Sequence, residues 1–118
     1  MSTTVYHYPA CSTCRKALKW LDEHKVAHER VHIVDKPPSA AQLKRALASG
    51  IPLKKLFNTS GESYKRGNFK DRLPDMSEAE AIKELAADGK LIKRPFVVKD
   101  SESFLTGFDE AAYREALL

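Results

Sequence analysis

The chain has 118 residues, of which 42% are hydrophobic and 31% charged, which is the composition of a globular protein of one-domain size with a buried core. Its N-terminal residues contain no apolar signal core, and no apolar run is long enough to span a bilayer. Because both features are missing, we expect a cytoplasmic protein that does not bind membranes. The net charge of +4 is mild.

The first elements in chain order flank both cysteines of the protein. Residues 4–8 are β-branched and aromatic, which predicts a strand. Apolar residues then recur at helical spacing over 14–24, with Ser12 or Thr13 as the expected N-cap. A second strand is predicted at 26–34, so the chain opens with a strand–helix–strand unit whose two strands run parallel.

Residues 37–89 are predicted to be mostly helical, and strands return only after them. Two capping boxes, Ser39 to Gln42 and Ser77 to Glu80, each indicate the start of a helix. The remaining expected elements are short helical pieces around 52–57 and 64–73, strands at 90–93 and 96–99, a hairpin strand at 103–108, and a last helix capped by Asp109.

This order of elements is β-α-β, then helices, then β-β-α, which predicts an α/β fold with a four-stranded mixed sheet. No linker or repeat divides the chain, so we expect residues 1–118 to form a single domain. Its core would be residues 1–36 and 90–118. Residues 37–89 would be a helical insertion, between the second and third strands, docked on the same body.

The cysteines form a CxxC motif, Cys11-Ser12-Thr13-Cys14, between a strand and a helix. A thiolate is favoured just ahead of a helix N-terminus, so Cys11 is the candidate nucleophile. Cys14, three residues on, is placed to resolve a disulfide formed on Cys11. Two alternatives are half of a zinc site and an inert structural pair. Zinc is disfavoured because the chain has no second CxxC and no HxxxH spacing.

Positive charge is concentrated in residues 36–72. This basic segment is either a partner surface or a set of solvated helix faces. The aromatic residues within it, Phe57, Tyr64 and Phe69, are better explained as core residues of short helices, so direct nucleic-acid binding is not expected.

Four segments together resemble one known family: Tyr8 to Ala17, Phe57 to Gly61, Leu91 to Pro95 and Leu105 to Phe108. They are similar to the arsenate reductase (ArsC) and Spx family of thioredoxin-fold proteins, especially to its small reductase-like members. The resemblance implies a thioredoxin-like fold with Cys11 as nucleophile. It also implies an active-site turn at Arg94-Pro95, with a cis proline facing the cysteine, and Arg94 would stabilise the thiolate and bind an anionic group of the substrate.

Two residues flank the candidate nucleophile in the sequence. Arg15 adds positive charge near Cys11 and is expected to lower the pKa of its thiol and to help bind substrate. His7 matches a histidine of the arsenate reductase branch. It is either a supporting residue of the site or a strand residue packed under the first helix.

The chain departs from the arsenate-reducing members of that family. They carry two further arginines, near the positions of Asn58 and Gly107, and tend to have a serine where Cys14 stands. Lys54 or Lys55 could substitute in part, but the departures argue against arsenate itself as the substrate.

The resulting prediction is a thiol–disulfide oxidoreductase with Cys11 and Cys14 as catalytic residues and no bound metal or prosthetic group. Glutathione with glutaredoxin, or thioredoxin, would be the external reductant. The alternative is a redox-sensing regulator like the Spx branch, which binds RNA polymerase and would include the basic segment in its partner surface.

Overall fold

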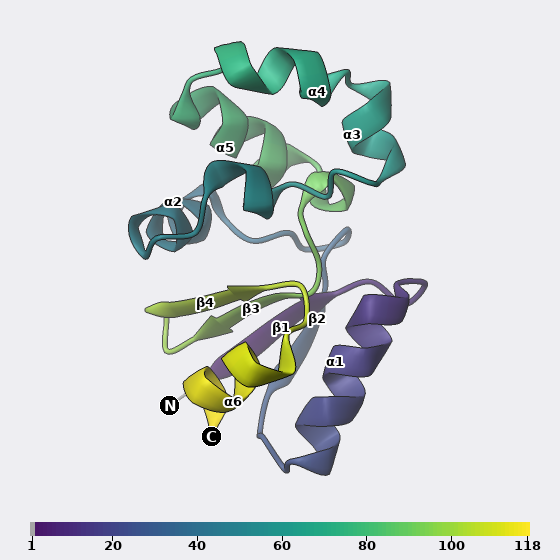
Figure 1. The fold of residues 1–118 in the computed structure, drawn as a ribbon, viewed down its shortest axis with the longest axis vertical. Helices are drawn as coiled ribbons and strands as arrows, with labels where there is room; N and C mark the ends of the chain where they lie inside the picture. The colour runs from purple at the N-terminus through teal and green to yellow at the C-terminus, as the bar shows by residue number, and fades with distance from the viewer. Residues whose placement is uncertain (1) are drawn as a thin grey trace.

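A four-stranded sheet lies at the centre of the computed structural model, which describes residues 2–118 (Figure 1). The strands are β1 (Thr3–His7), β2 (Glu29–His32), β3 (Phe96–Lys99) and β4 (Ser103–Thr106), in the order β2-β1-β3-β4. β1 pairs with β2 in parallel, while the β1–β3 and β3–β4 pairs are antiparallel. The predicted α/β fold with a mixed four-stranded sheet is confirmed.

Two helices cover one face of the sheet, α1 (Ser12–Glu23) and α6 (Glu110–Leu117) (Figure 1). Val5 of β1 and Val97 of β3 point to this face and pack with Trp20 of α1 and Tyr113 of α6. Because side chains alternate along a strand, the neighbouring residue Phe96 faces the opposite side. The two faces therefore carry separate hydrophobic clusters.

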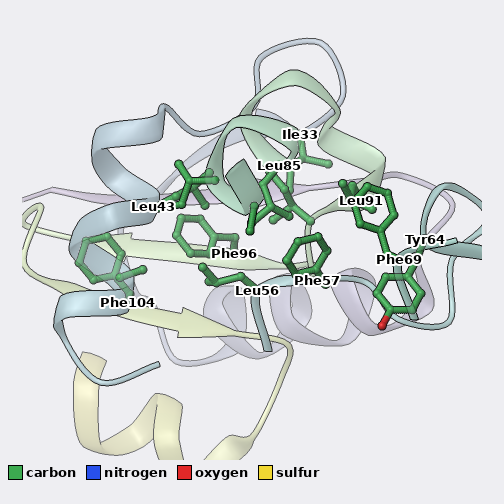
Figure 2. Packing of buried hydrophobic residues seen from close by; sticks show 14 of the residues in the cluster. Ile33, Leu43, Leu56, Phe57, Tyr64, Phe69, Leu85, Leu91, Phe96 and Phe104 are labelled. Atoms are coloured by element: carbon green, nitrogen blue, oxygen red, sulfur yellow. The ribbon is translucent and has the colours of Figure 1, made fainter. Parts of the chain in front are cut away.

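The helical insertion covers the other face of the sheet (Figure 1). Leu43, Leu56 and Leu85 from the insertion pack against Phe96 and Phe104 from the sheet (Figure 2). The insertion elements are α2 (Ala40–Ala48), the 3-10 helix η1 (Leu53–Leu56), α3 (Glu62–Arg66), α4 (Phe69–Arg72), the 3-10 helix η2 (Leu73–Asp75), α5 (Glu78–Ala87) and the 3-10 helix η3 (Gly89–Leu91). No helix described in residues 2–118 is long and apolar enough to cross a bilayer.

Both predicted capping boxes are present. Ser39 accepts a hydrogen bond from the Gln42 amide at the start of α2, and Ser77 accepts one from the Glu80 amide at the start of α5. In turn, the side-chain oxygens of Gln42 and Glu80 accept hydrogen bonds from the backbone amides of Ser39 and Ser77. Gln42 also accepts a hydrogen bond from the hydroxyl of Tyr6, which ties α2 to β1.

Two predicted strands differ from the structure. The second strand, predicted at 26–34, spans only Glu29–His32. It ends at His32 because the ring of His32 accepts hydrogen bonds from the amides of Val34 and Asp35 and turns the chain. The segment 90–93 is not a strand, since the Asp88 carboxylate caps η3 through the Lys90 amide. Only Ile92 pairs like a strand residue, in a bridge with Phe57.

Gly89 occupies a point where η3 touches the chain leaving β2. A Cβ at Gly89 would collide with the carbonyl oxygen of Ile33 and lie 2.7 Å from its carbonyl carbon. Both atoms belong to the backbone and cannot move aside as a side chain could. We expect Gly89→Ala to lower the free energy of unfolding by about 2–3 kcal/mol, measured by urea denaturation.

The matched control for that prediction is Gly61→Ala. The Cβ there would meet the side chain of Asn58, which can rotate away. Equal losses of stability in the two variants would contradict the role assigned to Gly89.

Candidate active site

Cys11 is itself the N-cap of α1. The helix begins at Ser12, and the Cys11 sulfur accepts a hydrogen bond from the amide of Cys14 at 3.3 Å. The Cys11 amide in turn donates to the carbonyl of Tyr8 at 3.0 Å, which closes the turn after β1. The prediction that Ser12 or Thr13 caps the helix is therefore wrong, because the thiol occupies the position of the capping oxygen.

Cys14 lies beneath Cys11 in the first turn of α1 and is fully buried. Both cysteines are free thiols in the structure. Burial raises the pKa of Cys14 to about 12, and the adjacent Cys11 sulfur acts in the same direction. Cys14 is thus held protonated at neutral pH.

The loop before β3 reaches the same site. The Arg94–Pro95 peptide bond is cis, as the resemblance implied, and the Pro95 carbonyl accepts a hydrogen bond from the Gly107 amide. Burial tends to raise the pKa of Cys11, but hydrogen bonds from the side chain and amide of Cys14, and from Arg94, outweigh it. The pKa of the Cys11 thiol is lowered as a result.

A pocket of about 480 Å³ opens beside the Cys11 thiol. It is lined by Ala10, Cys11, Ser12, Thr13, Asn58, Ser60, Gly61, Lys93, Arg94, Gly107 and Phe108. Two of these residues, Lys93 and Arg94, are basic and none is acidic, so the pocket suits an anionic ligand. No group of three or more His, Cys, Asp or Glu side chains in residues 2–118 is arranged to hold a metal ion.

Two other predicted site residues, Arg15 and His7, are not part of the lining of the Cys11 pocket. Arg15 is exposed on α1, and the groups that lower the pKa of Cys11 are Cys14 and Arg94. His7 is partly buried at the end of β1, with its ring 6.3 Å from that of His32. Burial, followed by the positive charges of His32 and Arg30, lowers the pKa of His7 and favours its neutral ring. The roles predicted for His7 and Arg15 stay predictions.

Lys93 is a basic residue of the Cys11 pocket that was not predicted from the sequence. Lys54 and Lys55 line a neighbouring pocket, whereas Lys93 lines the pocket of Cys11. The Lys93 side chain lies across Gly107, with its Cε 3.3 Å from where a Cβ on that glycine would be. Its place directly before Arg94 in the family-like segment was the available signal.

Tyr113 of α6 also supports the site, although it lies far from the CxxC motif in the sequence. Its buried hydroxyl donates a 2.6 Å hydrogen bond to the carbonyl of Gly107. Gly107 is therefore held from both sides, by Tyr113 and by Pro95. No signal in the sequence distinguished this tyrosine from other core aromatics.

The opposite pKa shifts of the two thiols predict selective alkylation. Iodoacetamide reacts with the thiolate, so at pH 7 it should modify Cys11 and leave Cys14 intact. The pH midpoint of the Cys11 reaction should lie below the ordinary value of 9.0 and should rise in Arg94→Met, where the stabilising cation is missing. Peptide mapping and the pH–rate profile measure both effects; preferential modification of Cys14 would contradict the assignment.

Comparison with known proteins places this geometry in a family. Residues 6–116 match the family model described as the ArsC family. The uncharacterised protein YusI of Bacillus subtilis is 49% identical over 116 residues, which cover 98% of each chain. A solved structure of an ArsC family related protein from Bacteroides fragilis superimposes with a TM-score of 0.92 at 44% identity, covering 98% of this chain and 97% of that one.

More distant relatives have different named activities. An arsenate reductase from Rhizobium meliloti is 30% identical over 99 residues, which cover 83% of this chain and 69% of that protein. Other relatives are global transcriptional regulators called Spx. The matched residues include the CxxC motif and the Arg94-Pro95 turn. The chain belongs to the ArsC family.

Proposed function

We propose that this protein is a thiol–disulfide oxidoreductase in which Cys11 is the nucleophile and Cys14 the resolving thiol. The observation that carries the proposal is the position of Cys11. Its sulfur caps α1 by accepting a hydrogen bond from the Cys14 amide. Arg94 lines the same pocket and helps to lower the pKa of the Cys11 thiol. An accessible thiolate beside a buried thiol is the arrangement that two-cysteine exchange requires.

In the first step the Cys11 thiolate attacks one sulfur of a substrate disulfide. A bond forms between Cys11 and that sulfur, the substrate's S–S bond breaks, and the other sulfur leaves as a thiolate with the electron pair. The helix N-terminus and Arg94 stabilise the anionic Cys11 sulfur before the attack. They also stabilise the negative charge of the leaving thiolate, which forms in the same pocket.

In the second step Cys14 attacks the Cys11 sulfur and releases the bound half of the substrate as a thiol. Cys14 loses its proton in this step, and the released thiolate can take it. The charge on Cys11 contributes to the raised pKa of Cys14, so forming the mixed disulfide removes that contribution. The products are a Cys11–Cys14 disulfide and a reduced substrate, and two electrons from an external thiol, such as glutathione or thioredoxin, restore the dithiol.

The pocket favours an anionic substrate over a neutral one. Arg94 and Lys93 provide the two positive charges of its lining. The family resemblance implies arginines near the positions of Asn58 and Gly107 in arsenate-reducing members, and both of these residues are uncharged here. This lining supports an anionic disulfide better than arsenate as the substrate.

Trapping with glutathione disulfide tests the assigned roles. The Cys14→Ser variant should accumulate one glutathione on Cys11, because the resolving thiol is absent. The wild-type protein should instead form the Cys11–Cys14 disulfide, and Cys11→Ser should stay unmodified. Intact-mass spectrometry with peptide mapping reads all three. A glutathione adduct on Cys14 in Cys11→Ser, or an unreactive Cys11 in the wild type, would refute the proposed function.

Removing the Lys93 charge tests the preference for anions. Lys93→Met should slow the reaction with 5,5′-dithiobis(2-nitrobenzoate), which carries two carboxylates, about two- to fivefold at low salt, and leave the reaction with neutral 2,2′-dithiodipyridine unchanged. Stopped-flow absorbance measures both rates. Lys83→Met, which removes the same charge outside the Cys11 pocket, is the control, and an equal effect in that variant would count against a local role.

A redox-sensing regulator is the second candidate, and the CxxC pair together with the Spx relatives favours it. In that case oxidation of Cys11 and Cys14 would control binding to RNA polymerase. A pull-down with purified polymerase under oxidising and reducing conditions tests it, and no binding in either state would leave the oxidoreductase alone.

A further inference from the structure

Arg94 rests on the aromatic ring of Tyr8. The guanidinium carbon lies 4.7 Å from the ring centroid, in the geometry of a cation–π contact. Both residues line a smaller pocket of about 220 Å³, and Arg94 forms part of the wall of the Cys11 pocket as well. The ring that contacts the cation is thus part of the smaller pocket and not of the lining of the Cys11 pocket.

Tyr8 is itself fixed by contacts to the protein body. Its partly buried ring packs against the hydrophobic cluster that the insertion shares with the sheet. The rings of Tyr8 and His32 form a T-shaped pair, with centroids 5.5 Å apart and ring planes at 75°. The Tyr8 carbonyl accepts the amide hydrogen bond of Cys11, so the residue that carries the ring also closes the thiol loop. The ring is thus a rigid platform tied to the candidate nucleophile.

The type of contact decides what Arg94 can still do. Within residues 2–118 no carboxylate forms a salt bridge with Arg94. Apart from its interaction with the Cys11 thiol, its side chain makes a 3.5 Å hydrogen bond to the carbonyl of Lys90. Stacking uses the flat face of the guanidinium, whereas hydrogen bonds to anions use its N–H edge. A carboxylate partner would occupy that edge and neutralise the charge.

We propose that Tyr8 is a positioning residue whose ring holds the Arg94 guanidinium at the Cys11 pocket, with its N–H edge unoccupied by any carboxylate and available to Cys11 and to an anionic substrate. The proposal rests on the oxidoreductase function proposed above. Tyr8 acts through Arg94 and takes part in no bond that forms or breaks. Losing the ring should allow Arg94 to adopt other rotamers and weaken its effect on Cys11 and on bound anions.

The test compares Tyr8→Leu, which removes the π face, with Tyr8→Phe, which keeps it. In Tyr8→Leu the pH midpoint of Cys11 alkylation should rise by about half a unit. Its rate with 5,5′-dithiobis(2-nitrobenzoate) should fall about threefold relative to the rate with neutral 2,2′-dithiodipyridine. Tyr8→Phe should match the wild type in both measurements.

The same variants in an Arg94→Met background separate positioning from a structural role. If Tyr8 acts through Arg94, the effects of Tyr8→Leu should disappear there. If they persist, or if Tyr8→Leu is silent in the parent protein, the proposal is overturned. When the wild type forms the Cys11–Cys14 disulfide and Tyr8→Leu is silent, only the role of Tyr8 fails. An unreactive wild-type Cys11 refutes the proposed function instead.

A measurement on the wild-type protein covers the case in which Tyr8→Leu does not fold. Proton NMR should show the Arg94 side-chain resonances displaced upfield by the ring current of Tyr8, with Arg94→Lys used for assignment. Side-chain resonances at ordinary positions would show that the stack is not populated and would overturn the proposal.

Discussion

The hydrogen bond from the Cys14 amide to the Cys11 sulfur is the constraint on which the site depends. A helix N-terminus needs acceptors for its free N–H groups, and here the acceptor is a thiol sulfur instead of a hydroxyl or carboxylate. An ionised sulfur accepts this bond better than a neutral one. The bond that caps α1 therefore acts together with the Cys14 side chain and Arg94 to lower the pKa of Cys11. The same turn places Cys14 underneath, buried and protonated, next to the sulfur it is proposed to attack.

Sheet topology brings the other groups to this sulfur. β3 runs antiparallel to β1, so the chain entering β3 lies beside the chain leaving β1, and the turn at Arg94 meets the loop of Cys11. β4 is antiparallel to β3, which returns Gly107 to the same edge. The insertion adds the loop at Asn58, whose amide donates to the carbonyl of Leu91. The pocket is thus assembled from four separate stretches of chain at one edge of the sheet.

Much of the fold followed from local signals that the structure confirms. The capping boxes at Ser39 and Ser77 marked α2 and α5 correctly, because a serine followed by Gln or Glu three residues later satisfies helix N–H groups within one turn. The same kind of local reasoning failed at 90–93, where the apolar pair before the turn suggested a strand. Capping of η3 by Asp88 competes with strand pairing there, and residue composition does not indicate which interaction wins.

The sequence by itself determined the CxxC pair between a strand and a helix, the order of elements, and through the family resemblance the Arg94-Pro95 turn. These depend on residues close together in the chain or on a pattern shared with relatives. Only the tertiary structure decided that Cys11 caps its own helix, that Lys93 and not Lys54 or Lys55 lines the thiol pocket, and that the ring of Tyr8 lies under Arg94. Those outcomes follow from side-chain directions and from the pairing of strand residues as far apart in the chain as Thr3 and Lys99, which local propensity does not specify.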